Sequence, residues 1–107
     1  MVTIEFKLNE ENIKKDGKTI NEIEKFLREF YKEKNVPEVD YLVFERDDQH
    51  ALAEIGLIIR FFIRNPEYRN YFSECKWYIN GLEENILEGF NRLEKKYGTK
   101  LQRKAVV

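Results

Sequence analysis

The sequence predicts a small α+β domain, in which three or four helices cover a sheet of two strands, or of three if one strand escapes detection. Three patterns predict this class. Residues 2–8 alternate between apolar and polar side chains, which is typical of a strand with one buried face. Residues 41–44 are a short apolar run between charged residues, and residues 66–97 repeat apolar side chains every three or four positions. The predicted order is β-α-β-α-α, with a further helix if the last segment divides.

The segment after the first strand leads into a helix. Residues 9–18 contain an Asp-Gly pair and are predicted to form a loop or turn. Thr19 and Glu22 have the spacing of a capping box, and apolar side chains recur at helical spacing behind them. Because Pro37 cannot donate a backbone hydrogen bond and restricts the residue before it, the helix is expected to end before this position.

The apolar run at residues 41–44 has the composition of a strand buried on both faces. Two strands joined through a helix are consistent with a right-handed parallel βαβ unit, and an antiparallel pairing is the alternative. Two strands alone are marginally stable. The sheet therefore relies on its helices, contains undetected strands, or is completed by another chain.

The segment from about residue 49 to residue 64 is predicted to be a helix buried between layers. Asp47 and Asp48 precede it and are suited to cap its first turn. Apolar side chains cover most of its circumference, a pattern typical of a buried helix. Residues 57–63 are also rich in strand-forming side chains, so a strand is the alternative there. The length of the segment and its cap favour the helix.

Residues 66–97 show the most regular helical pattern of the chain. A proline suits the first turn, and Gly98 suits a C-terminal stop. The pair Asn80-Gly81 either interrupts one long helix or separates two helices, and both arrangements fit the pattern. Residues 1–98 are predicted to form one compact domain, with residues 99–107 as a frayed C-terminal tail.

Charge and composition restrict the class of protein. The chain has 19 basic and 20 acidic residues, and its net charge of −1 gives no long-range attraction to nucleic acid or to anionic membranes. Cys75, the only cysteine, cannot form an internal disulfide. The chain shows no signal-peptide pattern and no apolar run long enough to span a bilayer. We therefore expect a cytoplasmic protein, and the abundance of Lys, Glu, Ile and Asn is consistent with a bacterial or phage source.

An acidic cluster with the only histidine follows the predicted second strand. If Asp47, Asp48, His50 and Glu54 converged, they could bind a divalent metal or act as general acid and base. In the simpler interpretation the aspartates cap a helix and His50 is an ordinary residue of its first turn. A metal-assisted hydrolase or nuclease that uses this cluster is the alternative function. No resident metal or cofactor is predicted.

Arg60 and Arg64 lie one helical turn apart on the only polar stripe of the predicted buried helix. Together with Arg69 they could form a basic patch that contacts a phosphate group or nucleic acid, and Arg60 and Arg64 could also contact a partner protein. Ion pairs with the abundant glutamates explain them more simply.

Trp77 is the residue that a core position explains least well. On a continuous helix its side chain points about 180° away from the apolar stripe and shares the outer face with Ser73, Glu84 and Glu88. An exposed tryptophan is a typical binding anchor. Alternatively, the helix breaks near residues 80–81 and Trp77 packs inward.

Taken together, these patterns favour a small accessory protein that binds another protein, as a regulator, inhibitor or immunity-type protein without chemistry of its own. The partner is expected to bind at a sheet edge or at a helix face. Homodimerisation through the same surfaces is an alternative form of this hypothesis. Nucleic acid is not an expected partner. The predicted partner-binding residues are Trp77, Ser73, Glu84, Glu88, Arg60 and Arg64.

Overall fold

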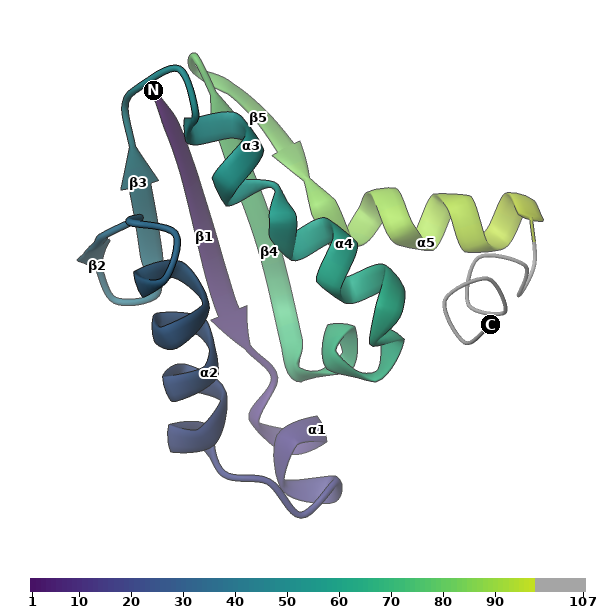
Figure 1. Cartoon of the computed structure of the whole chain (residues 1–107). Coiled ribbons are helices and arrows are strands. Elements are labelled where there is room, and N and C mark those ends of the chain that lie inside the picture. The colour runs from purple at the N-terminus through teal and green to yellow at the C-terminus, as the bar shows by residue number, and fades with distance from the viewer. Residues whose placement is uncertain (98–107) are drawn as a thin grey trace.

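The computed structural model describes residues 1–97 and arranges them around a five-stranded antiparallel sheet (Figure 1). Strand β1 (Val2–Leu8) lies at the centre, and the order across the sheet is β2-β3-β1-β4-β5. Its alternate residues are buried, as the sequence pattern predicts. The fold is α+β, but the predicted sheet of two or three strands and the predicted order β-α-β-α-α are wrong. The predicted tail, residues 99–107, lies outside the described residues.

Two helices follow β1. Helix α1 (Glu10–Lys15) forms where a loop was predicted, because the Oδ1 atom of Asn9 accepts a hydrogen bond from the backbone N–H of Asn12 and caps the helix. Helix α2 (Ile20–Lys32) confirms the prediction. The Thr19 hydroxyl accepts a hydrogen bond from the backbone N–H of Glu22 at 3.2 Å, which is the N-cap contact of a capping box.

Residues 41–44 form a turn and the start of a strand, rather than one strand buried on both faces. Strands β2 (Glu38–Asp40) and β3 (Val43–Arg46) make a tight hairpin, and Leu42 in its turn has a φ of 52°. Strand β3 pairs with β1 in antiparallel register. The predicted parallel βαβ unit is therefore wrong, and the antiparallel alternative is correct.

Residues 49–64 are mostly helical, although they divide into two helices. Helix α3 (Ala51–Ile55) and helix α4 (Leu57–Arg64) meet at Gly56. The helical interpretation of residues 57–63 is thus confirmed over the strand alternative.

The predicted helix or helices of residues 66–97 are wrong for residues 72–85. A 3-10 helix, η1 (Pro66–Tyr71), leads into strand β4 (Phe72–Ile79) and strand β5 (Leu82–Asn85). Only helix α5 (Ile86–Tyr97) is α-helical in this segment.

Asn80 and Gly81 form the two-residue turn of the β4–β5 hairpin. Their φ angles are 51° and 85°, the left-handed values that a type I′ turn requires. Asn-Gly is the sequence that favours this turn most strongly. The pair therefore joins two strands and does not interrupt a helix.

The core lies between one face of the sheet and helices α2, α3 and α4 (Figure 1). Aromatic rings fill it: the ring centroid of Phe6 lies 5.4 Å from that of Phe72 and 6.1 Å from that of Phe44. The buried hydroxyl of Tyr31 donates a hydrogen bond to the carbonyl oxygen of Ile55 at 2.9 Å, which ties α2 to α3. Helix α5 leaves the sheet where β5 ends and projects beyond its edge (Figure 1).

Candidate functional site

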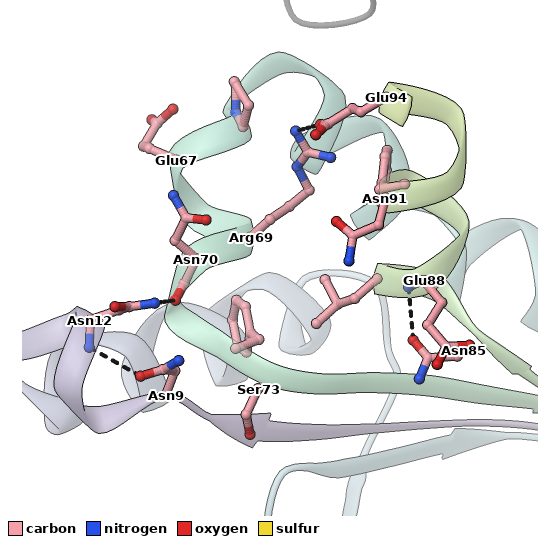
Figure 2. A pocket seen from close by; sticks show the side chains of 14 residues that line it. Asn9, Asn12, Glu67, Arg69, Asn70, Ser73, Asn85, Glu88, Asn91 and Glu94 are labelled. Atoms are coloured by element: carbon pink, nitrogen blue, oxygen red, sulfur yellow. Dashed lines mark hydrogen bonds and ion pairs between the residues drawn. The ribbon is translucent and has the colours of Figure 1, made fainter. Parts of the chain in front are cut away.

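An open cleft of about 750 Å³ lies between η1 and α5, beside the first half of β4 (Figure 2). This volume is within the range of ligand-binding sites. One wall comes from η1 and the other from α5, and the start of α1 contributes at one end. Most of its polar groups belong to amide and hydroxyl side chains, namely Asn9, Asn12, Asn70, Asn85, Asn91 and Ser73.

The cleft exists because β4 is twice as long as its neighbour β5. Strand β5 pairs with residues 76–79 of β4, and the chain then turns into α5 at Asn85. Residues 72–75 of β4 consequently have no neighbouring strand on that side within residues 1–97. The floor of the cleft therefore includes a length of unpaired strand edge.

A bulge in β4 lies at the edge of this cleft, and the side chain of its extra residue, Ser73, points toward β1 (Figure 2). Glu74 pairs with Lys7 of β1, whereas Phe72 pairs with Leu8, so Ser73 is the extra residue. Its side chain is exposed, and its hydroxyl lies 3.4 Å from the carbonyl oxygen of Lys7. Bulges are common next to binding sites because they change the direction of a side chain.

Hydrogen bonds fix several of the amide side chains. Asn12 Nδ2 donates to the carbonyl oxygen of Asn70 at 2.9 Å, and Asn85 Oδ1 accepts from the backbone N–H of Glu88 at 3.0 Å (Figure 2). The Asn91 amide instead points into the space between the two walls and forms no hydrogen bond with another side chain or backbone group of residues 1–97. An amide can donate and accept at once, so Asn91 is suited to contact a ligand.

Arg69 joins the two walls of the cleft. Its guanidinium forms an ion pair with Glu94 of α5 and lies 4.7 Å from the ring centre of Phe90. Only 10% of the side chain is exposed, and the buried Nε atom has no hydrogen-bond partner among the described residues. A buried donor without a partner is unfavourable by roughly 1–3 kcal/mol. An acceptor that enters the cleft would therefore stabilise this position.

The charged groups of the lining give it a negative balance. The lining contains three carboxylates, those of Glu67, Glu88 and Glu94, and one guanidinium, that of Arg69. The ion pair with Glu94 already compensates the charge of Arg69. The carboxylates of Glu67 and Glu88 therefore make the net charge of the cleft lining negative. A neutral or basic ligand is favoured over an acidic one.

The structure divides the predicted partner-binding residues between different surfaces. Ser73 and Glu88 line the cleft. Trp77 lies on β4 and faces the core side, half-buried, and its Nε1–H donates to Glu84 Oε2 at 3.2 Å. Trp77 and Glu84 are therefore neighbours on the strand pair β4–β5, and they do not line the cleft.

The arginines of α4 lie elsewhere. Arg60 and Arg64 are both exposed, and neither belongs to the lining of the cleft. The predicted partner-binding residues therefore do not form one continuous patch around the cleft.

The acidic cluster of the alternative function is spread over the loop before α3. Asp48 accepts a hydrogen bond from the Arg46 guanidinium at 2.7 Å, which contributes most to lowering the pKa of this carboxyl. Asp47 lies 3.3 Å from the N-terminal amine, and His50 is exposed. Glu54 lies on α3.

Residues 1–97 lack two features, a metal-binding cluster and a membrane-spanning helix. These residues contain no group of three or more His, Cys, Asp and Glu side chains placed to hold a metal ion. Their helices are also too short, or too polar, to cross a membrane. Cys75 is buried in the core, and burial raises the pKa of its thiol.

The sequence pattern singled out Ser73 and Glu88 of the cleft lining and missed most of the other wall residues. Asn85 and Glu88 have the spacing of an N-cap signal, which marks the start of α5 and could have located this end of the cleft. The sequence indicates Arg69 only as part of a basic patch with Arg60 and Arg64. Asn91 carries no sequence signal, because only the strand pair brings α5 next to η1.

Comparison of the chain with models of protein families, with curated proteins and with solved structures finds no match in any of the three.

Proposed function

We propose that this protein acts by binding another protein, and that an extended segment of the partner lies in the cleft between η1 and α5. The observation that carries the proposal is the unpaired edge of β4, residues 72–75, of which Phe72 and Ser73 line the cleft. A strand edge offers backbone N–H and C=O groups, which pair with the backbone of an extended segment. No chemistry is required of the protein in this role.

The walls of the cleft suit the same ligand. A peptide backbone has one donor and one acceptor at each residue. The side-chain amide of Asn91 can accept a hydrogen bond from the peptide N–H and donate one to the peptide carbonyl oxygen. The carbonyl oxygens of a peptide are also acceptors for the unpartnered Nε–H of Arg69. The carboxylates of Glu67 and Glu88 favour a segment with basic side chains.

We propose a regulatory or inhibitory role, as expected for an accessory protein that covers a surface of its partner. The single thiol of the chain suits the reducing cytoplasm of a bacterium or a phage-infected host.

The proposal is tested by selecting binders from a displayed library of random twelve-residue peptides and measuring their affinity by calorimetry. We expect extended, basic peptides, and we expect Asn91→Ala to weaken their binding about fivefold, since one hydrogen bond contributes about 1 kcal/mol. Arg92→Ala is the matched control, because Arg92 is the next residue of α5 and does not line the cleft.

Two results would contradict the proposal. One is a library that yields no specific binder. The other is a binder whose affinity is the same for the wild type and for Asn91→Ala, because the peptide then binds a different surface.

A further inference from the structure

Strand β5 forms a free edge of the sheet and carries the most exposed large apolar side chain among the described residues. Within residues 1–97 it pairs with β4 on one side and with no strand on the other (Figure 1). Leu82, its first residue, is 76% exposed. A free edge with an exposed apolar side chain is a template for a further strand.

The turn of the hairpin determines which backbone groups of β5 point outward. Ile79 and Leu82 close a two-residue turn and exchange backbone hydrogen bonds, and Trp77 and Glu84 form the next such pair. The N–H and C=O groups of Glu83 therefore point away from β4, toward the free side. Glu83 can donate one hydrogen bond and accept one from an added strand.

Two exposed carboxylates lie beside these backbone groups, one on each face of the sheet. Glu84 Oε2 accepts from Trp77 Nε1 at 3.2 Å, and Glu83 Oε1 accepts from the Tyr78 hydroxyl at 3.1 Å. Both carboxylates are thus held by side chains of β4, and Glu83 Oε1 also lies 3.9 Å from Lys76 Nζ of that strand. Strand β5 itself has no basic residue. A strand that approaches this edge meets the Glu84 carboxylate on one face and the Glu83 carboxylate, partly compensated by Lys76, on the other.

The same charges disfavour a second copy of this chain as the partner strand. In a two-fold antiparallel pair of β5 strands, a register centred on Glu83, on Glu84 or between them places glutamates directly opposite each other. Like charges in this arrangement destabilise a strand pair. A partner strand with lysine or arginine opposite these glutamates forms favourable cross-strand charge pairs instead.

We propose that the free edge of β5 binds an extended basic segment of a partner protein, which joins the sheet as a sixth strand. Its backbone pairs with Glu83, its basic side chains lie opposite the two glutamates, and an apolar side chain covers Leu82. Because the edge contacts are separate from the cleft, this inference goes beyond the proposed function and does not depend on it.

The test measures amide hydrogen exchange by NMR in the presence of a seven-residue peptide of alternating lysine and valine. The Glu83 amide is expected to exchange at least tenfold more slowly with this peptide. The Glu84 amide, which already bonds to β4, is expected to change little. A peptide of alternating glutamate and valine is expected to leave both unchanged.

Three variants separate the backbone contact from the charge. Glu83→Pro removes the outward N–H group, and an edge strand tolerates proline at such a position. Glu83→Lys reverses the local charge, and Glu33→Lys makes the same change at the end of α2, away from the edge. We expect the first two variants to bind the lysine peptide at least tenfold more weakly and the third to bind it normally. Thermal unfolding verifies that each variant is folded.

Three outcomes would overturn the inference. The first is a Glu83 amide that neither peptide protects. The second is protection that appears without peptide and increases with protein concentration, which would identify a second copy as the partner. The third is slower exchange at residues 72–75 instead of Glu83, which would place the peptide in the cleft and leave the proposed function intact.

Discussion

The indole ring of Trp77 packs against the backbone of Gly56, where α3 and α4 meet. A Cβ atom on Gly56 would lie 3.2 Å from Trp77 Cζ3 and 2.8 Å from the carbonyl oxygen of Leu52. The backbone of Gly56 has ordinary right-handed helical angles, so its conformation alone would permit alanine. Close packing, rather than backbone freedom, therefore requires glycine at this position.

Gly56→Ala is expected to destabilise the protein by roughly 1–3 kcal/mol, because the added methyl group has no space. Gly89→Ala is the matched control in α5, where no atom lies within 4 Å of the added Cβ atom. Alanine there is expected to stabilise the protein by roughly 0.5–1 kcal/mol, since it restricts the unfolded chain. Urea unfolding measures both values. A stabilising effect of Gly56→Ala would contradict the packing seen at Trp77.

The position of Trp77 also shows why its role could not be derived from sequence. On a helix its side chain points away from the apolar stripe, which suggests an exposed anchor. On a strand, alternation places Trp77 on the same face as Cys75 and Ile79, toward the core. The inward alternative was correct, but the reason is a strand and not a broken helix.

At the scale of elements, η1 is tied to the turn after α1 by one side-chain hydrogen bond. The Tyr71 hydroxyl donates to Asp16 Oδ2 at 2.8 Å, and the Tyr71 side chain is otherwise buried. Burial and this hydrogen bond raise the pKa of Tyr71 to about 12, from an ordinary value of about 10. This contact positions η1, which is one wall of the cleft.

The raised pKa predicts a loss of stability in alkali. Because the folded state keeps the Tyr71 proton to higher pH than the unfolded chain does, its contribution is complete below about pH 10 and is lost as pH rises toward 12. Tyr71→Phe is expected to be less stable than the wild type at pH 7. Between pH 10 and 12 the variant is expected to lose less free energy of unfolding than the wild type, by on the order of 1–2 kcal/mol. Urea unfolding followed by circular dichroism measures both curves, and equal slopes would contradict the assignment.

The bulge in β4 explains why residues 72–85 resemble a helix. Regular strands place every second residue on one face, but the extra residue Ser73 lets Phe72 and Cys75 both face the core. Phe72, Cys75, Ile79 and Leu82 are therefore separated by three, four and three positions. This is the spacing of apolar residues along one face of a helix. Leu82, however, is exposed, so the period has no common buried face.

At the scale of the whole molecule, the sequence predicts the elements that depend on local signals. The strand at residues 2–8, the helix capped by Thr19 and the helical character of residues 57–63 all follow from alternation, capping and length. The strand pairs β2–β3 and β4–β5 were not predicted, because their turns and bulges disguise the alternation. The cleft lies where β5 ends and α5 begins. Because β5 was not predicted, the cleft could not be predicted either.

The central claim is that a partner segment lies against the unpaired edge of β4. The most direct test is an amide chemical-shift titration of the ¹⁵N-labelled protein with the tightest peptide from the library selection. We predict the largest changes at Phe72, Ser73, Arg69 and Asn91, which line the cleft. Changes confined to α2, to the loop before α3 or to the edge of β5 would show that the peptide binds elsewhere and would contradict the claim.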